Sequence, residues 1–270
     1  MLKDLCFEVI QTCPNKCQFC SSNSSQEEKT IITLEDFKRT VMHFTKNGGI
    51  GEISISGGEP FLHPDLFEMV KFCKEQGIRT VIFTSGIKRA EDIPPEVIEY
   101  MKEKCAKDLQ EIEEHERWNE RLKRNVRAYY DRAIKPEPYG AITRQECEKL
   151  KQLGLDKIVF DWQAFEEETD TTLMGRKGLY TYLMDSLIRT KGRGLNVDVH
   201  FIPMKPNYRQ LPDIMECLEI AGVENISILN FVPQGRGRVN KEELMLSDEE
   251  LREFSTILNE AKEKFSGNVR

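Results

Sequence analysis

The chain has 270 residues, of which 39% are hydrophobic and 31% are charged, and its formal net charge is −7. This composition can bury a large core and so excludes a wholly disordered chain, while the acidic balance argues against nucleic acid as a partner. No apolar run approaches the ~18 residues that span a bilayer. The first residues, MLKDLCFEVI, lack the apolar core of a secretory signal, so we expect a cytoplasmic protein with no membrane association.

Short strand-like runs alternate with amphipathic helical patterns along most of the chain. The predicted strands are 5–10, 50–56, 79–84, 157–161, 196–202 and 225–231, and the predicted helices are 33–47, 65–76, 143–153, 180–192, 211–222 and 247–265. Strand and helix in repeated alternation favour a parallel sheet with right-handed crossovers. Six units are fewer than a closed eight-unit barrel needs, so the sequence predicts an α/β fold, a partial (β/α)6 TIM-type barrel over 1–240. The last helix makes 241–270 a C-terminal helical extension.

A long helical segment interrupts this alternation at about 93–137, after the third strand. It contains no Gly or Pro between Glu96 and Lys135, and its apolar residues recur at three- and four-residue spacing. A single helix over 96–135 would be ~60 Å long, so we expect it either to project or to fold back near His115. Three interpretations stay open: a solvated outer helix, a lid over the site, or a surface for a protein partner or dimer.

Three of the eight cysteines lie within eight residues, in the sequence TCPNKCQFC. The spacing of Cys13, Cys17 and Cys20 does not suit a straight helix or strand, so the chain must loop around its ligand. A structural zinc ion normally has four ligands, and the nearest further candidates, His43 and Cys73, are distant in sequence. Three thiolates with an open fourth position suit a [4Fe–4S] cluster.

The second motif is GGEP, which ends the second predicted strand in GEISISGGEPFLHPD. Gly57 and Gly58 permit close approach of the backbone, and Glu59 and Pro60 follow at the carboxyl end of the strand, where barrel enzymes have their active sites. Alone, such a sequence is typical of an ordinary glycine-rich turn. The cysteine loop on the preceding unit favours a functional role.

Together these motifs resemble the radical S-adenosylmethionine (SAM) superfamily. Its C-x3-C-x2-C loop matches Cys13, Cys17 and Cys20, with an aromatic residue, Phe19, before the last cysteine, and its GGE-type motif matches GGEP. Weaker similarity in FTSG, VHFIPMKPN and ILNFVPQGRG extends the resemblance from residue 5 to residue 239, apart from the insertion.

The resemblance implies that the cysteines hold three irons of a [4Fe–4S] cluster and that SAM binds the fourth. SAM is then cleaved by one electron to a 5′-deoxyadenosyl radical that removes a hydrogen atom from substrate. By this resemblance Glu59 accepts a hydrogen bond from the methionyl ammonium, Gly57 and Gly58 leave space for SAM with Pro60 beside them, and Phe19 contacts adenine.

Four further residues are placed at strand ends by the same resemblance. Ser85 and Asp161 are expected to meet the ribose or methionyl group, and an ordinary helix N-cap is the alternative for either. His200 and Asn230 alternate with apolar residues and are expected to face the barrel interior toward cofactor or substrate. An internal hydrogen bond is the competing interpretation.

The implied function is a radical SAM enzyme with one cluster, acting on a peptide or small-metabolite substrate and reduced by an external flavodoxin- or ferredoxin-type donor. One alternative is an activating enzyme that installs a glycyl radical on a partner protein, which would dock at 96–135. Another is a non-catalytic iron–sulfur binding protein. No catalytic residue is assigned beyond the binding sets above.

Overall fold

The computed structural model describes residues 2–114, 120–134 and 138–270. Within them the chain forms the following elements in order: β1 (Leu2–Ile10), α1 (Leu34–Lys46), β2 (Ile50–Gly57), the 3-10 turn η1 (Pro60–Leu62), α2 (Leu66–Glu75), β3 (Arg79–Thr84), β4 (Ile87–Arg89), α3 (Pro95–Glu113), α4 (Glu120–Ile134), β5 (Tyr139–Ala141), α5 (Arg144–Gln152), β6 (Lys157–Asp161), α6 (Glu167–Met174), α7 (Tyr180–Gly192), β7 (Val197–Phe201), η2 (Tyr208–Gln210), α8 (Leu211–Ile220), β8 (Asn225–Ile228), α9 (Arg236–Val239), α10 (Lys241–Leu244), α11 (Asp248–Lys264) and β9 (Asn268–Val269).

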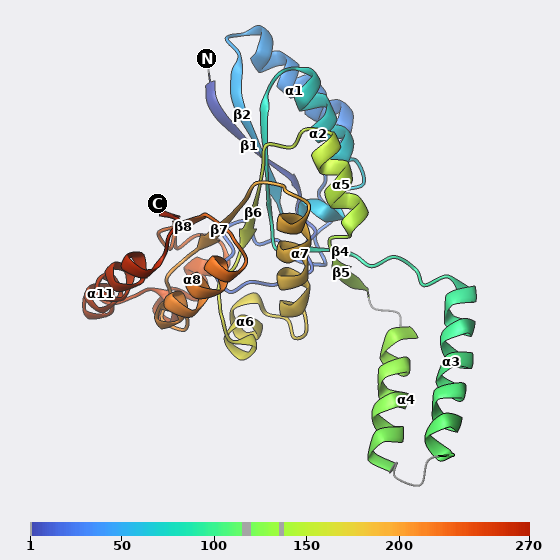
Figure 1. The fold of residues 1–270 in the computed structure, drawn as a ribbon. Coiled ribbons are helices and arrows are strands. Elements are labelled where there is room, and N and C mark those ends of the chain that lie inside the picture. The colour runs from blue at the N-terminus through green and yellow to red at the C-terminus, as the bar shows by residue number, and fades with distance from the viewer. Residues whose placement is uncertain (1, 115–119, 135–137) are drawn as a thin grey trace. The chain divides into compact units, whose positions relative to one another are not determined.

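The main sheet has the strand order β1-β2-β3-β6-β7-β8-β9, and every neighbouring pair is parallel. Helices α1, α2, α5, α7 and α8 connect successive strands and cover the outer face of the sheet (Figure 1). The predicted α/β fold is therefore confirmed, and its open parallel sheet is consistent with a partial barrel. The predicted sixth strand is too long, because β8 ends at Ile228.

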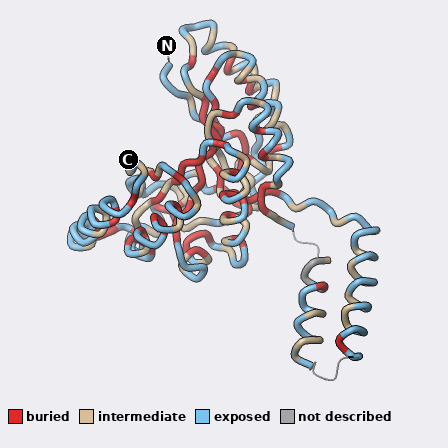
Figure 2. Tube along the Cα trace, in the orientation of Figure 1, coloured by how far each residue is buried: buried red, intermediate tan, exposed pale blue. Residues whose placement is uncertain are grey.

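Side chains alternate between the two faces of this sheet. On β6, Ile158 and Phe160 belong to the main hydrophobic core, whereas Val159 and Asp161 line the barrel interior. On β7, Phe201 points outward to the core and His200 inward to the interior. This period of two puts apolar side chains under the helices and polar groups in the interior. The buried residues gather in the sheet and the helices that pack on it (Figure 2).

The chain separates by contacts into two compact units, one made of Met1–Lys88 with Ala141–Arg270 and the other of Arg89–Gly140. The second unit contains α3 and α4, which pack antiparallel. Lys123 makes an ion pair with Glu113 (Nζ–Oε1 3.0 Å), and the Tyr130 hydroxyl donates to the Asp108 carboxylate. The insertion is thus a pair of helices and not one long helix. The expected turn at His115 lies outside the described residues.

The C-terminal segment adds a feature that the sequence analysis missed. After α11, which packs against α8, the two residues of β9 pair in parallel with β8 and extend the main sheet. The amide N–H of Ile228 donates to the Arg270 carbonyl (2.9 Å), which secures the chain end beside β8.

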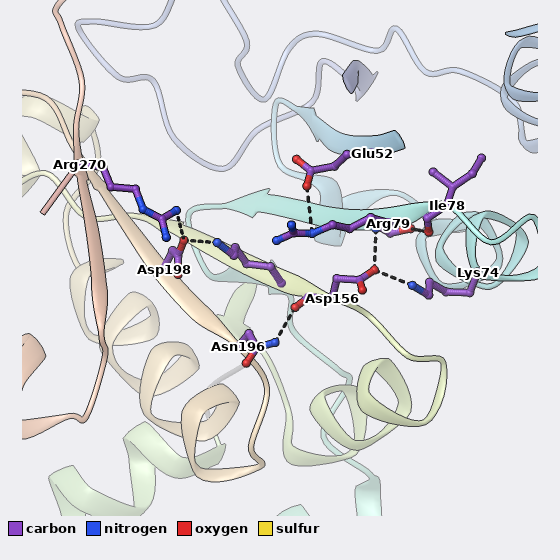
Figure 3. A network of polar contacts seen from close by, with 10 residues as sticks. Glu52, Lys74, Ile78, Arg79, Asp156, Asn196, Asp198 and Arg270 are labelled. Carbon is purple, nitrogen blue, oxygen red and sulfur yellow. Dashed lines mark hydrogen bonds and ion pairs between the residues drawn. The ribbon is translucent and has the colours of Figure 1, made fainter. Parts of the chain in front are cut away.

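Charged side chains meet at the amino-terminal end of the strands, opposite the predicted site (Figure 3). Lys157 on β6 pairs with Asp198 on β7, and Arg270 lies 3.9 Å from the same carboxylate. Nearby, Arg79 on β3 pairs with Glu52 on β2 at 3.1 Å. Asp198 is 4% exposed, so its negative charge is stable only beside a cation.

We expect the change Lys157→Met to lower the free energy of unfolding by about 3 kcal/mol, because it leaves the buried Asp198 carboxylate without its main counter-charge. The double variant Lys157→Met/Asp198→Leu should recover most of the loss, since an apolar pair needs no counter-charge. Chemical denaturation of the three proteins tests this. Equal stability of the single variant and the unmodified chain would show that the pair contributes nothing.

Candidate active site

A cavity of about 390 Å³ lies at the carboxyl ends of the parallel strands, where barrel enzymes carry their active sites. It gathers side chains from five strands and from the loops that follow them. Of the predicted site residues, the cavity is lined by Cys13, Cys17, Phe19, Cys20, Gly57, Gly58, Ser85, Asp161, His200 and Asn230. Glu59 and Pro60 lie directly behind this lining and are buried.

The cysteine loop follows β1 and contains no helix or strand. The N–H of Cys13 donates to the Ser25 carbonyl (2.9 Å), and the backbone N–H of Asn15 donates to the Cys13 sulfur. Burial raises the pKa of the Cys13 thiol to about 12 and that of Cys17 well above its usual value. Thiolates at these positions therefore require added positive charge, which bound iron supplies.

The further zinc ligands considered from the sequence are elsewhere. Cys73 is a buried residue of α2 in the main core, and His43 lies on α1 in hydrogen-bonding range of Asn47. Among the described residues, no three Cys, His, Asp or Glu side chains converge on one metal ion. A cluster does not need such convergence, because each cysteine binds a different iron atom.

Two buried polar atoms beside the cysteines have no partner within the described part of the chain. They are Oδ1 of Asn15 and Oγ of Ser24, both on side chains that are 2% exposed and both in the cavity lining. A buried polar group without a hydrogen bond is costly, so these atoms fit a polar ligand in the cavity. Together with the thiol set, they fit an iron–sulfur cluster with a polar molecule beside it.

The two glycines of GGEP are required by the packing of two loops. A Cβ atom on Gly57, whose φ is +135°, would lie 2.3 Å from the Ile10 carbonyl, and one on Gly58 would lie 2.3 Å from the Thr12 carbonyl. The N–H of Glu59 donates to Thr12 (3.0 Å) in the same contact. Glycine is therefore needed at both positions because the backbone that leads into the cysteine loop packs directly against them. The sequence predicted only that these glycines leave space for SAM.

Glu59 joins the ends of β2 and β3. Its carboxylate accepts from the Phe61 N–H (3.1 Å), the Thr84 hydroxyl (2.6 Å), and the N–H and hydroxyl of Ser85 (2.8 and 2.6 Å). Burial nevertheless raises the pKa of this carboxyl to about 7, so a nearby cation would stabilise its charged form. Contact with a methionyl ammonium stays a prediction, since four donors already occupy the two oxygens.

Asp161 ends β6 and is held by its neighbour Gln163, whose Nε2 donates to it at 2.5 Å. Gln163 also accepts from the Ile202 N–H (2.8 Å), which fixes the carboxylate relative to β7. Burial raises the pKa of Asp161 to about 6. Neither Asp161 nor Ser85 caps a helix in the structure, which removes the alternative interpretation of both.

The remaining predicted residues lie on different walls of the cavity. His200 packs against the Phe83 ring at a centroid distance of 5.2 Å, and burial lowers the pKa of its imidazole. Asn230 lies beyond the end of β8, so it reaches the cavity from a loop and not from the expected strand. Phe19 packs with Met174, Met204 and other buried residues in a small second core.

The residues that support the cysteine loop from outside it were not among those predicted. At the end of α6, the carbonyls of Met174 and Leu173 accept from the N–H groups of Lys16 and Gln18 (2.9 and 2.8 Å). Arg236 approaches the loop from the opposite end of the sheet order. The sequence GRGR after the last long strand was the available signal, because paired glycines often mark close backbone approach.

The raised pKa of Asp161 predicts a pH dependence in the protein without its cofactors. The pKa of Asp161 in the folded protein, about 6, exceeds the ordinary value of 3.8, so between these pH values the folded protein binds more protons than the unfolded chain. The free energy of unfolding therefore falls as pH rises through this range, by up to about 3 kcal/mol. We expect Asp161→Asn to flatten this fall in denaturant titrations, with exposed Asp4→Asn as the control. An unchanged pH profile in Asp161→Asn would contradict the assignment.

Comparison with known proteins gives consistent matches. Residues 7–132 match the family model of the Radical SAM superfamily. Across 261 residues the chain is 23% identical to the PqqA peptide cyclase of Granulibacter bethesdensis, covering 96% of this chain and 55% of that protein. It is 20% identical to the PqqA peptide cyclase of Bradyrhizobium diazoefficiens, covering 97% and 55%. The chain spans about half the length of these curated relatives.

The fold is shared with solved structures. Streptococcus suis SuiB bound to S-adenosylmethionine superposes with a TM-score of 0.62 at 15% identity, over 100% of this chain and 50% of that one. SuiB bound to its precursor peptide SuiA gives 0.61 at 16% identity, over 100% and 48%. The family match includes the three cysteines and the GGEP turn, and the shared fold extends over the whole chain, so this chain is similar in sequence and fold to the radical SAM superfamily.

Proposed function

We propose that the chain is a radical SAM enzyme that binds one [4Fe–4S] cluster through Cys13, Cys17 and Cys20 and acts on a peptide. The observation that carries the proposal is the lining of one cavity by all three thiols together with two unpartnered polar atoms. When bound, the cluster and SAM supply one-electron cleavage of SAM and a 5′-deoxyadenosyl radical for hydrogen abstraction.

The residues of this chain have separable tasks in that reaction. The thiols bind the cluster, and the Asn15 N–H stabilises negative charge on the Cys13 sulfur. Asn15 and Ser24 offer buried polar atoms to SAM, and Asp161, fixed by Gln163, offers a carboxylate to a hydroxyl or ammonium group. Glu59 holds the adjoining strand ends together through Ser85 and so keeps that wall of the cavity in place.

A peptide is the substrate class that the observations favour. PqqA peptide cyclase is named for a peptide, and SuiB was solved with its precursor peptide. In this chain, the segment after β8 lines the cavity and leaves apolar side chains accessible: Leu229 is 37% exposed and Val232 is 58% exposed. Such a rim suits a chain that lies across the mouth and inserts one side chain. A small metabolite is the alternative substrate.

We also propose a reducing, cytoplasmic setting and an external flavodoxin- or ferredoxin-type electron donor. The eight cysteines form no disulfide among the described residues. In the described part of the chain, every helix is too short or too polar to cross a bilayer.

Replacing any one of Cys13, Cys17 or Cys20 with Ala should abolish both cluster incorporation and SAM cleavage, because the cluster then lacks one of three protein ligands. The measurements are iron and sulfide content after anaerobic reconstitution and formation of 5′-deoxyadenosine with a chemical reductant. Cys6→Ala is the matched control, since Cys6 is an exposed thiol on β1. A full cluster in Cys17→Ala would contradict the ligand assignment, and a cluster without 5′-deoxyadenosine in the unmodified protein would indicate a binding protein.

For the helical insertion we propose a role in binding the peptide or a partner protein. Tyr100 and Tyr129 are 59% and 65% exposed on α3 and α4, although α4 turns its neighbouring residue, Tyr130, inward. The tyrosine of α4 that packs inward is therefore Tyr130 and not Tyr129.

Replacing 96–135 by a short Gly/Ser linker should leave cluster content and substrate-free SAM cleavage unchanged, because none of the described residues of 89–140 belongs to the main hydrophobic core. Stimulation of SAM cleavage by a peptide substrate should be lost. The readouts are iron content, 5′-deoxyadenosine formation with and without peptide, and thermal unfolding. Normal stimulation would make the helices dispensable, and failure to assemble the cluster would make them part of the fold.

A further inference from the structure

Arg236 is the first residue of α9 and makes three hydrogen bonds to the cysteine loop. Its backbone N–H donates to the Cys20 carbonyl (2.9 Å). Its Nε donates to the Cys17 carbonyl (2.8 Å) and its Nη2 to the Ser24 carbonyl (2.6 Å). One residue therefore connects two of the three cysteines with Ser24, four residues after the last of them.

The backbone around Arg236 is built for this contact. Gly235 has φ +55°, and a Cβ atom there would lie 2.4 Å from the Ser21 carbonyl. Four residues after Arg236, Asn240 donates from Nδ2 to the Gln18 carbonyl (2.9 Å). The backbone before Arg236 and the residue after α9 therefore both contact the cysteine loop. The position of Arg236 is fixed by these contacts and not by its side chain alone.

The charge of Arg236 is also distinctive. It is the one lysine or arginine among the described residues that line the cavity, which otherwise carries the acids Glu8 and Asp161 and three thiols. Its side chain lines the same cavity as the three sulfurs and is bonded to the backbone of Cys17. A cation near these sulfurs stabilises any state in which they carry more negative charge.

We infer that Arg236 is a positioning residue for the cluster: its guanidinium holds the three-cysteine loop in the conformation that binds iron, and its charge favours the reduced cluster. The inference rests on the proposed function, because it requires that the loop binds a cluster. A planar guanidinium suits the task, since it donates in two directions from one rigid group, whereas an ammonium is a point charge. Both bonded carbonyls would lose a charged donor if Arg236 were truncated.

The test compares Arg236→Met, Arg236→Lys and Arg238→Met after anaerobic reconstitution. Arg238 is the matched control, because it lies in the same short helix, is exposed and, within the described part of the chain, donates only from its backbone N–H, to Gly235. One readout is the rate at which an iron chelator extracts the cluster. The other is the midpoint potential of the cluster, followed by electron paramagnetic resonance during a redox titration.

We expect Arg236→Met to lose iron at least about tenfold faster, since two hydrogen bonds from a charged donor to the loop are removed. Its reduced-to-oxidised ratio at a given potential should fall about tenfold, a shift of about 59 mV to lower potential. Arg236→Lys should lose iron almost as fast but keep a potential close to that of the unmodified protein. Arg238→Met should match the unmodified protein in both.

Wild-type iron release in Arg236→Met would overturn the inference while leaving the proposed function intact. If the unmodified protein binds no cluster, the proposed function fails instead. If Arg236→Met binds no cluster but keeps its far-ultraviolet circular dichroism, the positioning role is supported. If it does not fold, Arg236→Lys decides: faster iron release supports the role, and wild-type release overturns it.

Discussion

The site depends on hydrogen bonds made to the backbone of a loop that has no regular structure. Residues 11–33 contain the three cysteines but no helix or strand, so only a few hydrogen bonds within the loop, such as those from Cys13 to Ser25 and from Cys20 to Cys17, fix the positions of its sulfurs. Three separate parts of the chain hold the loop from outside: the GGEP turn meets its start, the end of α6 meets Lys16 and Gln18, and α9 meets the segment 17–24. Each contact is made to carbonyls or N–H groups of the loop backbone, which every residue type has. The residue types that matter are therefore those that make the contact, the glycines that allow close approach and the charged Arg236.

The parallel sheet brings these three contacts together on one side of the molecule. In a parallel sheet all carboxyl ends emerge on one side, so segments far apart in sequence converge above the strands. Side chains that alternate along each strand then have different roles on the two faces of the sheet. Outward residues such as Phe160 and Phe201 build the core, inward residues at the amino ends form ion pairs around Asp198, and inward residues at the carboxyl ends, such as Asp161 and His200, line the cavity.

Much of this could be predicted from local sequence. Strands 79–84 and 157–161 were predicted with their observed limits, because both are short β-branched runs, and the cysteine and GGEP motifs were assigned to one site because both follow strands. What failed depends on contacts distant in sequence. The two-residue β9 exists only beside β8, and Arg236 acts on Cys17, 219 residues away. The role predicted for Gly57, space for SAM, was incomplete. The backbone that a side chain at Gly57 would clash with belongs to Ile10, at the end of β1.

Electron paramagnetic resonance of the reduced, reconstituted protein, recorded with and without SAM, tests the central claim most directly. Three cysteine ligands leave one iron of a [4Fe–4S] cluster open, so the account predicts a spectrum of one reduced cluster that changes when SAM is added. A spectrum that is unaffected by SAM, or a protein that binds zinc at these cysteines and no iron, would contradict it.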